Sequence, residues 1–145
     1  MQKISLQEAL PTAELLEELR AIEQEALPHE RWDLELWQAF LLRRNCLLFT
    51  AVGGFALVAL APGEAELIKI AVRPEARRQG LGSALLNAAI EALQKRRIEQ
   101  LFLEVRASNQ AARNLYESLN FQRVGIRKDY YKTPREDALV YQIKL

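Results

Sequence analysis

The sequence predicts an α/β (α+β) protein in which about four helices flank a mixed sheet of about six to seven strands. Two observations carry this prediction. Short apolar segments bounded by glycine and proline are typical of strands, whereas other segments place apolar residues three or four positions apart, as on one helix face. In order, they give strand, two helices, three strands, helix, strand, helix and two strands. With 145 residues, the chain is expected to form a single domain, residues 1–145.

The first elements are expected to be a short strand near residues 4–6 and two helices. Four apolar residues at spacings of four, three and four mark one face of the first helix: Leu15, Leu19, Ile22 and Ala26. Pro28 ends this helix, because proline lacks the N–H group that a helix interior needs. A shorter second helix is predicted over Leu34–Leu42.

Three strands should follow. The apolar runs 46–52 and 55–61 are separated by Gly53-Gly54, which predicts a hairpin turn. A third run, 67–72, ends before Pro74, because proline cannot donate to a strand ladder.

The next helix is predicted from Leu81 to about residue 96, because four apolar residues repeat at every fourth position: Leu81, Leu85, Ala89 and Leu93. The strand 101–106 alternates, so its two faces carry different residues. One face holds Leu101, Leu103 and Val105, and the other holds Phe102, Glu104 and Arg106.

The last helix is expected to be capped by Ser108-Asn109 and to end at Leu119. Asn120 falls where a left-handed C-terminal cap is needed, a conformation that asparagine tolerates. Strands at 121–126 and 138–144 complete the predicted sheet.

Charge is distributed unevenly along the chain. Residues 1–72 hold 6 Lys/Arg against 11 Asp/Glu, and residues 73–145 hold 14 against 8. The acidic half suits a basic substrate and the basic half an anionic cofactor, although charged faces that are merely solvated would give the same division. Lys95-Arg96-Arg97 ends a helix, where cations favour the dipole, so direct nucleic-acid binding is not expected.

Other classes of site are not indicated. No apolar stretch approaches the roughly 20 residues that cross a bilayer, and the first residues lack the apolar core of a signal peptide. We therefore expect a cytoplasmic protein without a membrane partner. One cysteine, Cys46, and one histidine, His29, lie in unrelated segments, so neither an internal disulfide nor a metal site is expected.

The most informative motif is Arg77-Arg78-Gln79-Gly80-Leu81-Gly82-Ser83, which opens a helix after a strand. The first N–H groups of a helix lack partners and carry the positive end of its dipole, so this motif predicts a phosphate site. A P-loop would need Gly-Lys-Ser/Thr, which is absent, and a dinucleotide-binding fingerprint would need glycine instead of Leu85. A structural turn remains the alternative.

The pattern Arg-x-x-Gly-x-Gly is similar to the pyrophosphate loop of the GNAT superfamily of N-acetyltransferases. The segments 103–109 and 115–119 look like the rest of that superfamily's cofactor site. Five segments together resemble the RimI-type ribosomal-protein N-terminal alanine acetyltransferases: 70–72, 78–82, 103–109, Tyr130-Tyr131 and 135–138. The resemblance is dense from about residue 64 to residue 138, and before that it rests on the order of elements.

The resemblance implies the GNAT fold and an acyltransferase that uses acetyl-coenzyme A. The acceptor would be a protein N-terminal α-amine, on a basic small-subunit ribosomal protein that begins with alanine. It implies that Glu104 is the general base, Tyr116 the general acid and Tyr131 a grip on the acceptor peptide. Cofactor contacts would come from Ile70, Ala71, Val72, Arg78, Gln79, Gly80, Leu81, Gly82, Ser83 and Asn109.

The chemistry of the residues agrees with these roles. An α-amine has a reference pKa of about 8, against about 10.4 for lysine, so a carboxylate such as Glu104 can deprotonate it directly or through one water. A phenol such as Tyr116 can protonate the departing thiolate. The N–H of Val72 is the expected oxyanion donor. The alternatives are an edge-strand or salt-bridged Glu104, for example with Arg106, and a Tyr116 that only packs.

Two departures from the family pattern are visible. Asn120 replaces the usual glycine, which affects only a helix cap. The segment 27–32 follows the family's Pro-Trp region loosely, so substrate choice is less defined by the sequence. We expect Trp32 to line the wall opposite Tyr131, with core packing as an equal alternative.

Two rival functions remain open. One is a GNAT enzyme that acts on a lysine side chain or a small-molecule amine, for which a more alkaline optimum is expected. The other is a non-catalytic acyl-coenzyme A sensor, which would bind the cofactor without turnover. The sequence does not define the oligomeric state.

Overall fold

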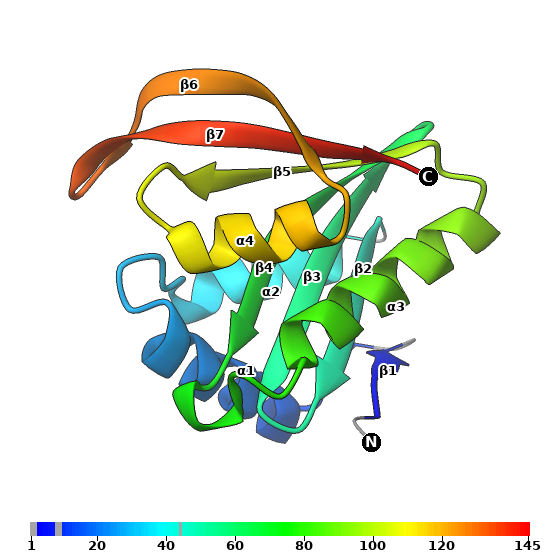
Figure 1. The fold of residues 1–145 in the computed structure, drawn as a ribbon. Helices are drawn as coiled ribbons and strands as arrows, with labels where there is room; N and C mark the ends of the chain where they lie inside the picture. Colours follow the sequence, from blue (N-terminus) through cyan, green and yellow to red (C-terminus); the bar gives the residue numbers. More distant parts are fainter. Residues whose placement is uncertain (1–2, 8–9, 44) are drawn as a thin grey trace.

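The computed structural model describes residues 3–7, 10–43 and 45–145. Its centre is a seven-stranded sheet with the strand order β1-β2-β3-β4-β5-β7-β6 (Figure 1). The strands are β1 (Ser5–Gln7), β2 (Cys46–Ala51), β3 (Gly54–Ala61), β4 (Glu64–Val72), β5 (Gln100–Arg106), β6 (Gln122–Lys132) and β7 (Arg135–Lys144). Only β4 and β5 run parallel among the described pairs, so the mixed sheet predicted from the sequence is confirmed.

Four helices cover the two faces of the sheet: α1 (Ala13–Ala26), α2 (Leu34–Leu42), α3 (Leu81–Lys95) and α4 (Gln110–Ser118). In Figure 1, α1 and α2 lie behind the sheet, and α3 and α4 lie in front of it. The predicted order of helices and strands is therefore confirmed element by element. Within the described ranges, no helix has the length and apolar character of a membrane span.

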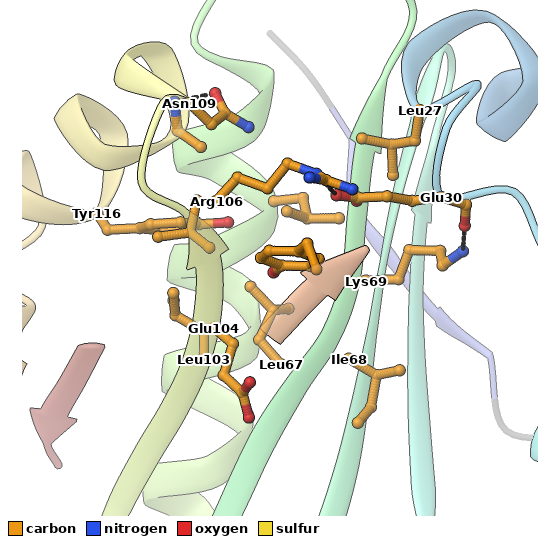
Figure 2. A pocket seen from close by; sticks show the side chains of 14 residues that line it. Leu27, Glu30, Leu67, Ile68, Lys69, Leu103, Glu104, Arg106, Asn109 and Tyr116 are labelled. Atoms are coloured by element: carbon orange, nitrogen blue, oxygen red, sulfur yellow. Dashed lines mark hydrogen bonds and ion pairs between the residues drawn. The ribbon is translucent and has the colours of Figure 1, made fainter. Parts of the chain in front are cut away.

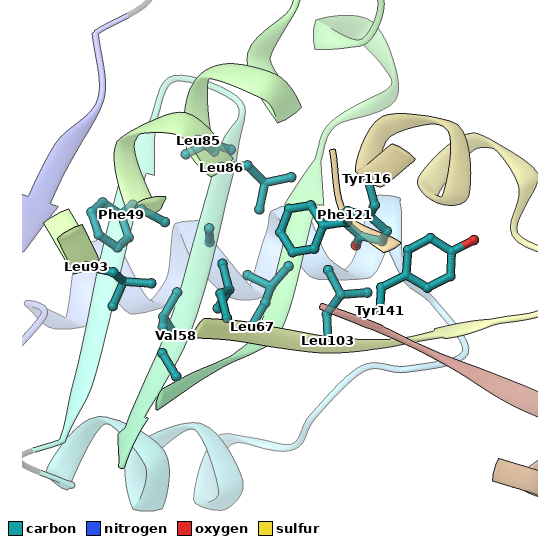
Figure 3. Packing of buried hydrophobic residues seen from close by; sticks show 14 of the residues in the cluster. Phe49, Val58, Leu67, Leu85, Leu86, Leu93, Leu103, Tyr116, Phe121 and Tyr141 are labelled. Atoms are coloured by element: carbon teal, nitrogen blue, oxygen red, sulfur yellow. The ribbon is translucent and has the colours of Figure 1, made fainter. Parts of the chain in front are cut away.

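The apolar faces predicted for the helices form two cores, one on each side of the sheet. On the front side, Leu81, Leu85, Ala89 and Leu93 of α3 are all buried (Figure 3). On the rear side, Leu19 and Ile22 of α1 pack with Trp37 of α2. Because helices cover both faces of the sheet, a ligand can reach its interior only where neighbouring strands separate.

The strands β4 and β5 separate after a short parallel contact. Their pairing covers three positions, Glu64 with Gln100, Ala65 with Leu101 and Glu66 with Phe102, and neither strand pairs with the other beyond these residues. The remaining length of β4, up to Val72, and of β5, up to Arg106, therefore flanks a gap in the sheet.

A β-bulge at Ile68 decides which side chains of β4 face the front. Leu67 pairs with Val58 and Lys69 pairs with Leu57, so Ile68 is the extra residue. Leu67 packs in the front core, whereas Ala71 and Ile68 pack in the rear core. The extra residue shifts the alternation, and Ile70 and Val72 consequently face the front, beside α3 and α4.

The β6–β7 hairpin is longer than the sequence predicted. Strands were expected at 121–126 and 138–144, but β6 continues to Lys132 and β7 begins at Arg135. Most of β6 is exposed, so its residues do not need to alternate between apolar and polar. The pattern on which the prediction depended is absent there, although the backbone pairing continues to Lys132 and Arg135.

Candidate functional site

A groove of about 670 Å³ lies in front of the sheet, where α3 begins beside β4 and α4. Ile70, Ala71 and Val72 line one side, and Asn109 and Tyr116 line the other. The floor comes from the glycine-rich loop, through Arg78, Gly80, Leu81, Gly82 and Ser83. The structure thus gathers all but one of the residues predicted to bind the cofactor. The exception is Gln79, which does not line this groove and whose side-chain amide donates to the carbonyl of Glu75 at 3.3 Å.

The start of α3 has the properties of an anion site. Thr12, Asp33 and Asn109 cap the other three helices with side-chain oxygens, but the N-cap of α3 is Gly80, which has no such oxygen. Gly80 adopts a left-handed conformation, with φ of 77°. The first N–H groups of α3 therefore lack a capping side chain, and a bound anion can accept from them.

Gly82 allows the two front helices to approach each other. A Cβ atom at this position would lie 3.1 Å from Cδ2 of Leu115 on α4. The groove is bounded by α3 and α4, so this close contact keeps its two walls together. Arg77 and Arg78 also line the groove and give it positive charge.

A second pocket, of about 100 Å³, lies in the gap between β4 and β5 (Figure 2). It shares Ile70, Asn109 and Tyr116 with the front groove, so the two spaces adjoin. Its remaining walls include Leu27, Glu30 and Tyr131. We call this space the acceptor pocket.

Glu104 lies on the rear side of the gap. Leu103 and Val105 pack in the front core, so the alternation of β5 turns Glu104 to the opposite face. Its side chain is 18% exposed and its Oε1 lies 3.4 Å from Nε of Arg127. Its Oε2 is buried and has no hydrogen-bond partner among the residues that the structure describes. The alternative of a salt-bridged Glu104 is therefore observed, with Arg127 as the partner instead of Arg106.

Tyr116 approaches the gap from the front. Its ring is buried beside Phe121 and Tyr141, and Figure 2 shows its hydroxyl pointing toward the side chains of the acceptor pocket. Burial, followed by the charge of Glu30 and by Tyr131, raises the pKa of the Tyr116 hydroxyl above its usual value. The phenol therefore remains protonated throughout the neutral range. The ring of Tyr116 therefore packs in the core, as the alternative expected, and its hydroxyl also faces the acceptor pocket.

The N–H of Val72 points into the gap. The N–H of Arg73 donates to the carbonyl of Gly53, on the β3 side, at 2.7 Å. Successive N–H groups of a strand point in opposite directions, so the N–H of Val72 is directed toward β5. The carbonyl of Val72 accepts from Nε of Arg77 at 3.2 Å.

Several residues of the acceptor pocket were not identified from the sequence. The most buried of the charged ones is Lys69, which forms an ion pair with Glu23 of α1. Nε1 of Trp37 also donates to Glu23 at 2.9 Å, and Nζ of Lys69 donates to the carbonyl of Glu30 at 2.8 Å. This network joins α1, α2 and β4, and it fixes the loop that carries Leu27 and Glu30. In the sequence, the only local sign of this network is a lysine within an otherwise apolar strand.

The two residues predicted to hold a peptide are placed differently. Tyr131 lines the acceptor pocket, where burial, followed by Glu30, raises the pKa of its hydroxyl. Trp32 stacks on Phe40 at 4.7 Å and lies under Nζ of Lys69 at 4.1 Å. The geometry brings Trp32 into the rear core rather than to the wall of the acceptor pocket. Among the described residues, no group of three or more His, Cys, Asp and Glu side chains could hold a metal ion.

Comparisons with known proteins agree with this arrangement. Residues 12–121 match the model of the acetyltransferase (GNAT) family. Over 96 residues the chain is 48% identical to the [ribosomal protein bS18]-alanine N-acetyltransferase of Escherichia coli K12, and over 94 residues it is 36% identical to a putative enzyme of that name from Bacillus subtilis. The E. coli alignment covers 65% of each chain, slightly less than two thirds of the relative.

Solved structures extend the likeness to the whole chain. The ribosomal-protein-S18-alanine N-acetyltransferase of E. coli superposes with a TM-score of 0.84 and 38% identity, covering 99% of this chain and 94% of that one. Arabidopsis thaliana NAA60 in complex with acetyl-CoA gives a TM-score of 0.85 at 18% identity, covering 99% and 100% of the two chains, which supports the fold alone. The resemblance and the fold class predicted from the sequence are confirmed, and the chain belongs to the acetyltransferase (GNAT) family.

Proposed function

We propose that the protein transfers the acetyl group of acetyl-coenzyme A to the N-terminal α-amine of a protein. One observation carries the proposal: the gap between β4 and β5 joins an anion-binding groove in front of the sheet to a small pocket that Glu104 borders from behind. A thioester and an amine can therefore meet inside the sheet from opposite faces. Turnover needs both openings, which favours an enzyme over a sensor.

The front groove fits the chemistry of coenzyme A. The uncapped start of α3 and Arg78 suit a pyrophosphate, and the side of the groove formed by 70–72 runs from there to the gap. If the arm of coenzyme A lies along this side of the groove, it can accept hydrogen bonds from the N–H groups of β4 that β5 leaves unpaired. Bound in this way, acetyl-coenzyme A supplies the activated acyl group, and its thioester would lie beside Val72 and Tyr116.

The residues at the gap can balance the protons of acyl transfer. Glu104 takes the proton from the ammonium form of the acceptor, directly or through one water. The N–H of Val72 donates to the carbonyl oxygen as negative charge develops on it. Once the amine nitrogen has bonded to the acetyl carbon, Tyr116 gives its proton to the sulfur as the C–S bond breaks, and the second proton that the new amide nitrogen loses returns the Tyr116 phenolate to the phenol. These roles for Glu104, Val72 and Tyr116 belong to the proposal, and their placement on both sides of the gap supports it.

We further propose that the acceptor is a basic small-subunit ribosomal protein that begins with alanine. The acceptor pocket, at about 100 Å³, suits a small first residue. Behind the sheet a groove leads away from it, and its carboxylates include Glu64, Glu66 and Glu104. Desolvation, followed by the charge of Glu104, raises the pKa of Glu66, although Arg43 and Arg127 also line this groove and act in the opposite direction. Relatives 48% identical are named [ribosomal protein bS18]-alanine N-acetyltransferases. A ribosomal acceptor would place the enzyme in the cytoplasm.

A matched pair of peptides tests the proposed function. One peptide begins with a free Ala-Arg, and the other has the same sequence but a blocked N-terminus and an internal lysine. Release of coenzyme A with the free peptide alone is the expected result. Turnover of the blocked peptide would instead assign the enzyme to the lysine class. Binding of acetyl-coenzyme A without turnover of either peptide would favour small-molecule acceptors or the sensor.

A further inference from the structure

Arg106 connects three segments that are distant in the sequence. It lies at the end of β5, on the same face as Glu104, and its side chain is only 14% exposed. Its Nε donates to Oε1 of Glu30, in the α1–α2 loop, at 3.3 Å. Its two other nitrogens donate to the carbonyls of Thr133 and Pro134, at the turn of the β6–β7 hairpin, at 3.1 and 3.0 Å.

The hairpin is held at two further points. The guanidinium of Arg106 stacks over the ring of Tyr131, with its carbon 4.1 Å from the ring centre. Its Nη1 also donates to Oε1 of Glu136 at 3.3 Å, and Oε2 of Glu136 accepts from the N–H of Ser108 at 2.7 Å. The hydrogen bond from Ser108 lowers the pKa of the Glu136 carboxyl. Glu136 thereby joins the hairpin to the loop before α4.

The α1–α2 loop is held from its other side as well. The carbonyl of Glu30 accepts from Lys69, which is itself paired with the buried Glu23. Glu30 is thus fixed by its backbone to β4 and by its side chain to β5. Figure 2 shows Arg106 and Glu30 extending toward each other across the acceptor pocket.

We propose that Arg106 is the positioning residue of the acceptor pocket: it fixes Glu30 and Tyr131 as opposing walls and so determines how tightly the acceptor binds. This inference rests on the proposed function, because it concerns the amine substrate of the same site. The planar guanidinium is required, since a lysine cannot reach a carboxylate, two carbonyls and a ring at once. Arg106, Glu30 and Tyr131 do not line the groove for acetyl-coenzyme A.

Steady-state kinetics of three variants test the inference. For Arg106→Gln we expect the KM for the peptide to rise about tenfold or more, while the KM for acetyl-coenzyme A stays within about twofold. Arg106→Lys should recover part of the loss, because it keeps the charge beside Glu30. Glu30→Gln should raise the peptide KM by a smaller factor, and the double variant should be no worse than Arg106→Gln, because the two residues act as one unit.

Arg73→Gln is the matched control. Arg73 also bridges two carboxylates, Glu18 and Glu25, both at 2.8 Å, and its side chain is 20% exposed, but it does not line the acceptor pocket. Its loss should lower the melting temperature and leave the peptide KM unchanged.

Three results would overturn the inference. The first is an unchanged peptide KM in Arg106→Gln, the second is an equal rise in both KM values, and the third is the same rise in Arg73→Gln. Should Arg106→Gln fail to fold, the exposed Glu30 provides the test, and an unchanged peptide KM in Glu30→Gln would then contradict the inference.

The wild-type protein is measured first. Absence of turnover with the free peptide would reject the proposed function, and the same variants would then be assayed with the amine that the wild type does acetylate.

Discussion

The groove at the start of α3 and the acceptor pocket differ in how the chain builds them. Backbone groups dominate the groove: the uncapped N–H groups of α3, the left-handed Gly80 and the free edge of β4. The acceptor pocket depends on side chains that meet from four segments, among them Glu30, Lys69, Arg106 and Tyr131. The first should tolerate most side-chain truncations, and the second should not.

This difference matches the two ligands. A pyrophosphate is the same in every acyl-coenzyme A, so a backbone cradle that needs only a glycine-rich turn is sufficient for it. An acceptor has to be distinguished from other amines, and specificity of that kind needs side chains that neighbouring elements hold in place. Four predictions can break or sharpen the contrast, and they follow in order of decreasing effect.

Replacing the proposed base should have the largest effect. Glu104→Gln keeps the size of the side chain but removes the proton acceptor, so we expect kcat to fall by about 10²- to 10⁴-fold. Binding of acetyl-coenzyme A, measured by calorimetry, should be unchanged. Glu66→Gln provides the contrast, because it should weaken binding of a basic peptide without a comparable loss of kcat. Full turnover by Glu104→Gln would contradict the proposed mechanism.

Breaking the buried ion pair should cause the largest loss of stability. Lys69→Met leaves the carboxylate of Glu23 buried without its cation, and the loss of one partner from such a pair costs about 3–5 kcal/mol of unfolding free energy. Urea unfolding measures it. The double variant Lys69→Met, Glu23→Gln should recover a large part of the loss, because no charge remains buried. A double variant as unstable as the single one would show that packing, not charge, explains the effect.

Alanine substitutions at two glycines can distinguish the effect of backbone strain from an effect on ligand binding. Gly80 and Gly63 have φ values of 77° and 76°, and a Cβ atom would meet nothing within 4 Å at either position. Both alanine variants should therefore lose about 1–2 kcal/mol of stability. Only Gly80→Ala should also raise the KM for acetyl-coenzyme A, because only Gly80 lines the front groove. Equal KM values for the two variants would contradict the assignment of the groove.

The smallest effect concerns alkaline stability. The raised pKa of Tyr116 means that the folded protein keeps this proton at a pH where the unfolded chain releases it, above about 10. Stability from this source is complete below that pH and decreases as the pH rises. Tyr116→Phe should therefore lose less stability than the wild type between about pH 9 and 11. Urea midpoints across this range measure the difference, and parallel curves would be the contrary result.

The sequence predicted the front groove well, because its determinants are local. The helix period of α3 and the uncapped Gly80 can both be seen within one short segment of the sequence. In the acceptor pocket, the sequence predicted Glu104, Tyr116 and Tyr131 as site residues but not the network that surrounds them. Glu30, Lys69 and Arg106 come together through tertiary contacts, and the bulge at Ile68 changes the face of β4 without a local signal. Trp32 is near the pocket in sequence but packs with Phe40 in the rear core.

The central claim, that the cofactor and the acceptor occupy opposite faces of the gap, can be tested by hydrogen–deuterium exchange. Acetyl-coenzyme A alone should protect residues 78–84 and 109–112, at the starts of α3 and α4. A non-reactive acceptor peptide, added with coenzyme A, should additionally protect residues 27–32 and 129–136. Protection by the peptide that is confined to the start of α3 would contradict the two-sided arrangement.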